Sequence, residues 1–254
     1  MHRLTASQLM QVWEQGAGDL PVRRALALLE AACREEPGEV LAGLSLGQRD
    51  DRLLVLREWT FGSRLDSVAD CPSCHERLEM SFRVGELRHV SQPGAPPGKE
   101  GQRWAYEMEG WRVLYRLPSS LDLLALADKD QPVKSLEPPA PVGRQLFERC
   151  VLSAERQGET MPVAAIPDDV ARGVTAEMRQ HDPLAEILLN LACPTCGHAW
   201  QAPFDILTYF WNEIEVWVYR TLKEVHRLAR AYSWSESEIL GLSDWRRQAY
   251  LAMV

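Results

Sequence analysis

Two Cys-Pro-x-Cys motifs constrain the fold of this chain more than any other feature of its sequence. The segment CPSCHERLEMSF begins at Cys71, and the segment CPTCGHAWQAPF begins at Cys193. The correspondence extends past the cysteines, because Phe82 in the first segment matches Phe204 in the second. Each motif is followed by an alternating stretch that predicts a β-strand. The repeat therefore predicts two similar halves of one small β unit, brought together from distant parts of the chain.

The four cysteines of these motifs predict a single metal site. Thiolates are strong ligands for zinc, and each Cys-x-x-Cys turn offers two sulfurs at a spacing that suits one tetrahedral ion. Cys71, Cys74, Cys193 and Cys196 would fill the shell and leave no open position for water. We therefore expect a structural Zn²⁺ ion that crosslinks a zinc ribbon, with no catalytic residue and no other cofactor.

Other uses of paired cysteines fit the sequence less well. Residues 71–75 also spell the c-type haem attachment signature, but covalent haem would need an exported chain. A thioredoxin-like redox pair is disfavoured because the sequence shows no βαβ pattern around either motif. A zinc deaminase is disfavoured because the sequence contains no His-x-Glu motif. A nucleic-acid-binding zinc ribbon stays as the alternative function. The residues around the motifs are mixed in charge rather than basic: Glu76, Arg77, Glu79, Arg83, His198, Gln201 and Asp205.

The remaining cysteines and histidines are expected to have structural roles. With four sulfurs available, His75 and His198 are interpreted as neighbours of the metal site rather than ligands. Cys33 and Cys150 fall on apolar helical faces and are expected to be small core residues. His226 lies in a predicted helix with apolar neighbours, which favours a core or surface position over a catalytic one.

Composition narrows the classes of function. The chain has 254 residues and a formal net charge of −8, which argues against broad electrostatic binding to nucleic acid or to an anionic membrane. The sequence shows no secretory signal and no apolar run long enough to span a membrane. Six cysteines without such a signal suggest a reducing compartment. The chain also lacks the common nucleotide-binding, hydrolase and metalloprotease motifs, so we expect a non-enzyme.

Periodicity and capping residues predict most of the secondary structure. Helices are expected over 5–16, from Pro21 to 35, over 48–60, 121–128, 143–155, 168–182 and 205–232, and after the caps Ser235 and Ser243. A hairpin is expected over 103–118, with Glu109-Gly110 at its tip. Residues 91–102 and 130–142 are rich in Pro and Gly and are expected to be linkers.

These elements predict an α+β protein in which a discontinuous zinc ribbon is flanked by N-terminal helices and a long C-terminal helical arm. The expected regions are an N-terminal helical region at 1–60, the first half of the ribbon with a hairpin at 61–118, a helical insertion with the Pro-rich linker at 119–181, the second half of the ribbon at 182–206, and the arm at 207–254. The arm carries Trp211, Trp217, Trp234 and Trp245, which are expected either in the core or at a contact with a partner.

Several segments together resemble a known family. They are LALLEAA, LSLGQRDDRLLVLREWTFG, DCPSCHERLEMSF, LACPTCGHAWQAPFDI and the final fifty residues. In this order they resemble the baseplate hub assembly proteins of T-even-type contractile phage tails and of phage-tail-like contractile injection systems. The resemblance implies an assembly factor, or chaperone, or a structural subunit that binds other baseplate, hub or spike proteins. It also implies assembly in the cytoplasm, with or without retention in the particle.

Overall fold

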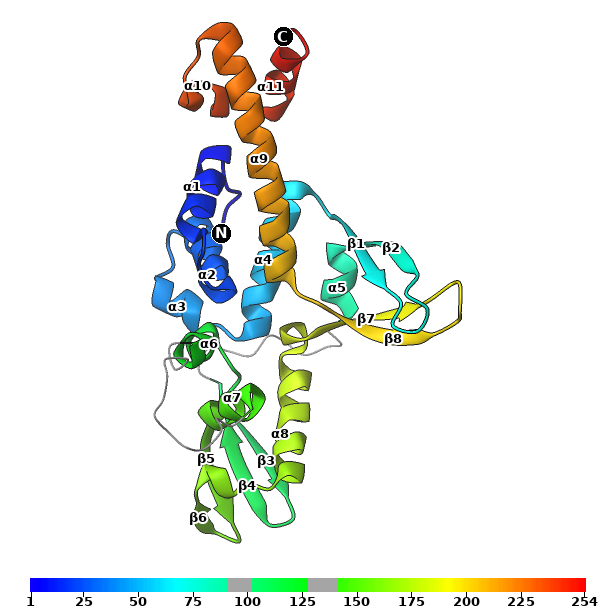
Figure 1. Cartoon of the computed structure of the whole chain (residues 1–254). Coiled ribbons are helices and arrows are strands. Elements are labelled where there is room, and N and C mark those ends of the chain that lie inside the picture. Colours follow the sequence, from blue (N-terminus) through cyan, green and yellow to red (C-terminus); the bar gives the residue numbers. More distant parts are fainter. Residues whose placement is uncertain (91–101, 128–140) are drawn as a thin grey trace, which may run out of the picture. The chain divides into compact units, whose positions relative to one another are not determined.

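The computed structural model of the chain describes residues 1–90, 102–127 and 141–254, so the two predicted linkers lie almost wholly outside the described residues. The chain divides into two compact units, which are described separately. The first comprises Met1–Pro37 and Asp205–Val254, and the second comprises Gly38–Phe204. Helices and small antiparallel sheets occur together in the chain, as the predicted α+β class requires (Figure 1).

The described part of the first unit is entirely helical. It contains α1 (Ala6–Gly16), α2 (Pro21–Ala32), α9 (Ile206–Tyr232), α10 (Glu236–Leu240) and α11 (Asp244–Leu251). Side-chain caps fix several helix starts: Thr5 and Ser235 form capping boxes, and Asp205 accepts a hydrogen bond from the backbone N–H of Leu207. Pro21 opens α2, so the predicted start of this helix is confirmed.

The first unit is built around one face of α9. Ile214, Val218 and Leu228 lie on this face and are fully buried. Near the start of α9, Trp211 packs so closely against Gly16 that a methyl group at Gly16 would lie 2.5 Å from the indole ring. Arg24 stacks over the same indole, with its guanidinium carbon 4.6 Å from the ring centroid. The long amphipathic helix predicted from the sequence is therefore the core element of this unit.

The second unit alternates short helices with short strands. Its helices are α3 (Gly38–Gly43), α4 (Leu46–Phe61), α5 (Val84–Val90), α6 (Ser120–Ala127), α7 (Val142–Cys150) and α8 (Asp168–His181), with 3-10 turns η1 (Val163–Ala165) and η2 (Pro183–Ala185). Its strands are β1 (Arg64–Asp70), β2 (Arg77–Arg83), β3 (Trp104–Met108), β4 (Trp111–Tyr115), β5 (Val151–Arg156), β6 (Glu159–Met161), β7 (Ile187–Ala192) and β8 (Ala199–Phe204). Gly62, with a φ of 93°, ends α4, because glycine adopts positive φ without steric cost.

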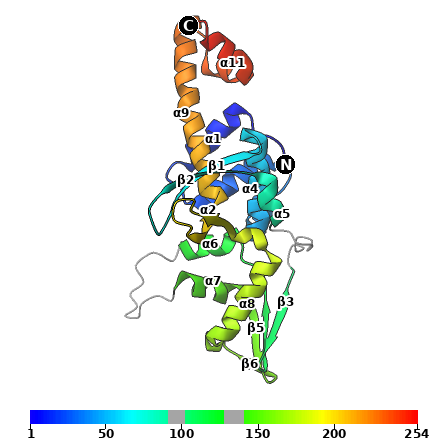
Figure 2. The ribbon, with the colours of Figure 1, turned by 90° about the vertical axis from the view of Figure 1, so that its right-hand side faces the viewer.

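The described strands form three antiparallel sheets. The largest is a meander in the order β3-β4-β5-β6, and the other two are the separate hairpins β1-β2 and β7-β8. The predicted turn at Glu109-Gly110 joins β3 to β4, and both residues have positive φ, as a two-residue hairpin turn requires. Helix α8 covers the meander and shares its core, in which Val113, Tyr115 and Val174 are completely buried (Figure 2).

One secondary-structure prediction was wrong in its last five residues. Residues 143–155 were expected to form a single helix, but the helix ends at Cys150 and β5 follows it directly. In β5, Ala154 pairs with Val113 of β4 and with Met161 of β6. The apolar run around Cys150 has no period that separates helix from strand, so the tertiary pairing determines the outcome.

A buried carboxylate ties two distant segments of the second unit together. The hydroxyl of Ser45 donates to Oδ1 of Asp182 at 3.0 Å, and the backbone N–H of Gly47 donates to Oδ2 at 2.9 Å. Burial raises the pKa of Asp182, while the hydrogen bonds from Gly47 and Ser45 oppose this change. The contact holds the first turn of α4 against η2, immediately before β7, and so helps to position the second hairpin.

We predict that Gly47→Ala lowers the free energy of unfolding by about 1–3 kcal/mol, because a Cβ atom would overlap the contact with Asp182. It would lie 2.2 Å from the Asp182 carboxylate and 2.9 Å from the backbone nitrogen of Ala185. Gly43→Ala is the matched control, since a Cβ atom there meets nothing within 4 Å. Chemical denaturation of both variants measures the difference, and equal unfolding free energies would contradict the role of Gly47.

Candidate metal centre

The first Cys-x-x-Cys turn is a tight knuckle between β1 and β2. The backbone N–H of Cys71 donates to the carbonyl of Glu76 at 2.9 Å, and the N–H of His75 donates to the carbonyl of Cys71 at 2.9 Å. His75 has a φ of 60°, a left-handed conformation that ordinary side chains seldom adopt. This conformation reverses the chain within a few residues and allows β2 to return alongside β1.

The second turn, between β7 and β8, has the same construction. The N–H of Cys193 donates to the carbonyl of His198 at 2.8 Å, and the N–H of Gly197 donates to the carbonyl of Cys193 at 2.9 Å. Gly197, with a φ of 73°, occupies the place that His75 holds in the first turn. The internal repeat seen in the sequence is therefore also a repeat of backbone conformation.

The two hairpins repeat each other as well. Leu65 pairs with Phe82 across the first hairpin, and Ile187 pairs with Phe204 at the corresponding place in the second. The rings of Phe82 and Phe204 meet edge to face, with centroids 5.4 Å apart. The matched phenylalanines thus form an apolar contact between the hairpins at the ends of β2 and β8, away from the turns.

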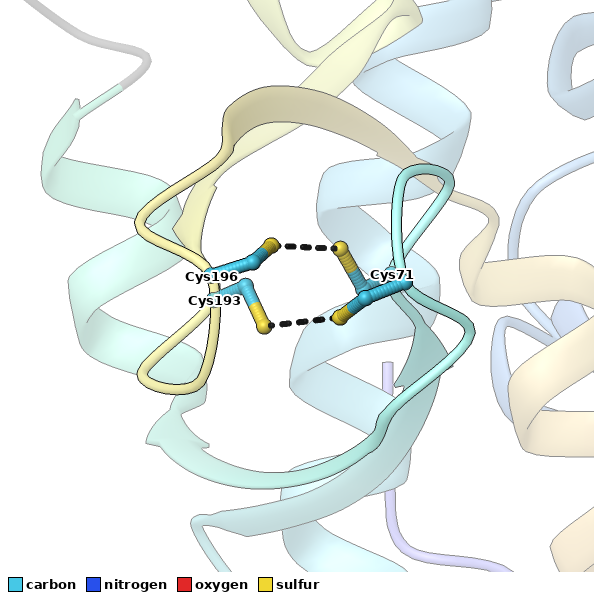
Figure 3. Close-up of side chains that lie close together, drawn as sticks. Cys71, Cys193 and Cys196 are labelled. Atoms are coloured by element: carbon cyan, nitrogen blue, oxygen red, sulfur yellow. Dashed lines mark hydrogen bonds between the residues drawn. The ribbon is translucent and has the colours of Figure 1, made fainter.

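The two knuckles face each other, and all four sulfurs converge (Figure 3). The sulfurs of Cys71 and Cys196 lie 3.7 Å apart, those of Cys74 and Cys193 lie 3.6 Å apart, and all four fall within 4.8 Å of one another. A tetrahedral ion with metal–sulfur bonds of about 2.3 Å places its sulfurs about 3.8 Å apart. The four cysteines therefore lie close enough together to hold one metal ion, and the spacing fits a tetrahedral shell.

Burial of the cysteines differs within each turn. Cys71 and Cys193, the first cysteine of each turn, are buried, whereas Cys74 and Cys196 are exposed. The cluster of four cysteines thus has one side packed against the protein and one side open to solvent. Four thiolates would satisfy a tetrahedral ion completely, and such a closed shell crosslinks a fold without activating water.

Neighbouring groups shift the pKa values of two of the four thiols in opposite directions. The backbone N–H groups of Cys196 and Thr195 stabilise the Cys193 thiolate and lower its pKa to about 7, although burial opposes them. The N–H of Glu76 lowers the pKa of Cys74, but the neighbouring thiols of Cys196 and Cys193 raise it, to about 12. Crowded sulfurs cannot all ionise together unless a cation neutralises them.

The two histidines beside the knuckles stay outside this cluster. Among the described residues, the group that could hold a metal contains only the four cysteines. His198 stacks on Trp200, with ring centroids 5.9 Å apart. Cys33 and Cys150 are buried, and burial raises the pKa of Cys150 to about 12, so this thiol is unreactive at neutral pH.

Two contributors to the geometry had no clear signal in the sequence. Asp182 anchors the segment that leads into β7, but a buried aspartate after a helix looks like any exposed one in the sequence. Gly47 lies within the first turn of α4, where a glycine is unfavourable for helix formation. Its position there was the only indication of a close contact.

Comparison with known protein families relates most of the chain to a described family. Residues 23–211, about three quarters of the chain, match the family described as T4 bacteriophage base plate protein. The chain belongs to this family of phage baseplate proteins. The match spans both knuckles and ends at Trp211, near the start of α9. Searches of curated proteins and of solved structures gave no significant match.

Family membership gives the chain a structural role related to the phage baseplate. It favours a non-enzymatic function, and it suggests assembly with other baseplate proteins in a phage particle. No helix in residues 1–90, 102–127 or 141–254 combines the length and apolar character needed to cross a membrane.

We predict that metal affinity falls as the pH is lowered through about 7. Protons compete with the metal for the sulfurs, and Cys193 takes up its proton as the pH falls below its pKa of about 7. Titration with cobalt(II), followed by its thiolate absorption between pH 8 and pH 6, measures the effect. An affinity that does not change over this range would contradict ligation by the thiolates.

The matched turn positions provide a second prediction. His75→Gly should raise the free energy of unfolding by about 0.5–1 kcal/mol, because glycine adopts positive φ without steric cost. Gly197→Ala should lower it by about 1 kcal/mol, and through φ alone, since a Cβ atom there meets nothing within 4 Å. Chemical denaturation of both variants measures whether their changes in the free energy of unfolding have opposite signs. A change of the same sign in both would show that the two turns are not equivalent.

Proposed function

We propose that this protein is a non-enzymatic component of the baseplate hub of a contractile phage tail or a contractile injection system, acting as an assembly factor or as a structural subunit. Membership of the phage baseplate family supports this role most directly. The partners would be other hub, wedge or spike proteins, and binding would take place in the cytoplasm of the producing cell, before or during particle assembly.

We also propose that Cys71, Cys74, Cys193 and Cys196 hold one structural Zn²⁺ ion, which makes the two hairpins a zinc ribbon. The single observation that carries this proposal is the convergence of four sulfurs from turns 122 residues apart in the sequence. Zinc favours four-sulfur tetrahedral shells. The ribbon would comprise parts of residues 61–118 and 182–206, with the insertion 119–181 between its halves.

The proposed ion would fix the register of two segments that the chain itself joins only through a long insertion. Each hairpin has just two strands, and a two-stranded sheet is marginally stable in water. A crosslink at the turns, together with the Phe82–Phe204 contact at the other end, would hold both hairpins as one rigid surface. A rigid surface loses little conformational entropy on binding, which suits recognition by shape during assembly.

The exposed side chains of the first hairpin favour a protein partner over nucleic acid. Arg77, Glu79, Ser81 and Arg83 alternate along the outward face of β2, so cations and anions are mixed. Nucleic-acid backbones are bound by clustered cations. The alternative function, a nucleic-acid-binding zinc ribbon, therefore lacks the expected charge pattern at the knuckles.

We predict that the purified chain holds one zinc ion per molecule and loses it on replacement of paired ligands. Native mass spectrometry of Cys71→Ser/Cys193→Ser should show no bound zinc, together with a lower unfolding temperature. Cys33→Ser/Cys150→Ser is the control with the same number of cysteines removed, and it should retain the ion. Equal zinc content in both double variants would contradict the assignment of ligands.

The assembly role predicts co-purification at a defined stage of particle formation. A tagged chain, expressed from its own locus in the cell that makes the particle, should be recovered with baseplate proteins identified by mass spectrometry. Recovery from finished particles would identify a subunit, whereas recovery only from complexes that lack sheath would identify an assembly factor. Absence from both fractions would contradict the proposed function.

A further inference from the structure

A row of cations runs along the exposed side of α9, outside the metal centre. Residues 216–234 contain four Arg or Lys and one Glu, a formal charge of +3 in a chain whose total is −8. Arg220, Lys223 and Arg227 are spaced three and four residues apart, so they share one face of the helix. All three are exposed. They span about 10 Å along the helix axis at 1.5 Å per residue.

Helix α11 lies against the C-terminal half of α9 (Figure 1). The three cations line a groove between these two helices. The groove is an open cavity of about 390 Å³, here called the basic groove. Its lining consists of Arg220, Lys223, Glu224, Arg227, Gln248, Leu251 and Ala252. Three cations therefore surround one carboxylate, and apolar side chains complete the wall.

The single carboxylate of the basic groove is already engaged by other groups. Nε of Arg247 donates to one oxygen of Glu224 at 2.8 Å, and Nε2 of Gln248 donates to the other at 2.8 Å. Arg247 is only 2% exposed, so the Glu224–Arg247 pair is a buried structural contact. It fixes α11 on α9 and contributes little negative charge to the groove.

Glu224 is the one side-chain carboxylate in the lining of the basic groove, so the three cations there outnumber it. Nε of Arg220 lies 3.8 Å from Glu224, which is longer than a hydrogen bond. Arg227 donates to main-chain oxygens of Leu251 and Val254. Lys223 makes no ion pair or side-chain hydrogen bond with any residue that the structure describes.

The helix dipole accounts for only part of this charge. A helix C-terminus favours cations within its last turn, which explains Arg230. Arg220 and Lys223 lie two or more turns further from the end of α9 at Tyr232, beyond the reach of that effect. Glu224 balances at most one of these charges, and solvent ions or a bound anionic group balance the remainder.

Apolar side chains extend the same exposed face toward the start of α9. Val216, one turn before Arg220, is 71% exposed, and Tyr219 is 52% exposed while contacting Trp13 edge to face. Trp245, expected from the sequence in the core or at a partner contact, is 80% exposed on α11, whereas Trp211 is buried. Exposed aromatic residues combined with Arg are typical of protein interfaces.

We infer that the basic groove binds an acidic segment of another protein, with two or more of its carboxylates paired to Arg220, Lys223 and Arg227 and its apolar side chains covering Val216. The choice of partner rests on charge complementarity. The groove is cationic although the chain as a whole is acidic, so an acidic segment is the complementary surface. Mixed apolar and cationic lining favours protein over nucleic acid. That the partner is a baseplate protein rests on the proposed function.

The direct test uses a fluorescein-labelled peptide of alternating glutamate pairs and single leucines as the probe, with binding followed by fluorescence anisotropy. Binding should be strong at low salt and should weaken as salt is added, because exposed charges are screened. Arg220→Glu/Lys223→Glu should weaken it by about tenfold or more. Arg220→Gln/Lys223→Gln should have a smaller effect in the same direction.

The matched control is Arg3→Glu/Arg34→Glu, which makes the same charge change at two exposed positions outside the groove. It should leave peptide binding within about twofold of the unchanged chain. Circular dichroism and thermal unfolding of all variants confirm that they are folded. Equal weakening by the control pair, or no binding by the unchanged chain, would overturn the inference. The inference would also be overturned if the chain bound a short DNA duplex more tightly than the peptide. It would be overturned as well if the chain self-associated and the groove substitutions abolished this self-association.

A second experiment distinguishes failure of this inference from failure of the proposed function. The groove variant and the control variant each replace the chain in the producing cell, and complexes are recovered through a tag. If the unchanged chain joins baseplate complexes and only the groove variant is lost, both proposals stand. If both variants join equally, the groove inference fails alone. If the unchanged chain joins no baseplate complex, the proposed function fails, while the peptide measurement still tests the groove.

Discussion

The convergence of four sulfurs is the contact on which the two small hairpins of this molecule depend. Two hairpins of two strands each are too small to be stable alone, and the first pair of cysteines is separated from the second by the whole of the meander and α8. Their apolar contact, Phe82 against Phe204, lies at the end opposite the turns. A single ion bound by both turns would restrain the other end, so one proposed coordination shell would fix the geometry of both hairpins.

The structural features that could be predicted from the sequence are those determined by residues close together in the chain. The caps Ser235 and Ser243 and the turn at Glu109-Gly110 each act within a few residues, and the structure has each of them where the sequence indicates. The long helix α9 was predictable because its apolar stripe continues for more than seven turns. The cysteine pairs are local motifs too, so the sequence alone indicates which four side chains should meet.

The parts that could not be predicted depend on contacts between distant segments. Strand β5 follows α7 without a break, and only its pairing with β4 and β6 distinguishes it from more helix. The meander has a second two-residue turn, Gln157-Gly158, with positive φ at both positions, and it was missed because β5 was assigned to a helix. The contact of Asp182 with Gly47 joins residues 135 apart in the sequence and has no local signature.

The separation of roles between the two units fits an assembly protein. The second unit contains the donor set and most of the family match, whereas α9 beyond Trp211, with α10 and α11, lies outside that match. The proposed ion would provide rigidity in one unit, and the exposed cations and aromatic residues would provide a binding surface in the other. Neither arrangement requires a reactive group, which agrees with a structural role in the baseplate.

X-ray absorption at the zinc edge of freshly purified protein tests the central claim most directly. We expect one zinc ion per chain surrounded by four sulfurs at about 2.3 Å, with no nitrogen or oxygen atom coordinated to it. A shell that includes imidazole nitrogen or water, or a spectrum from protein with no stoichiometric zinc, would contradict the claim that the two remote turns are fastened by one ion.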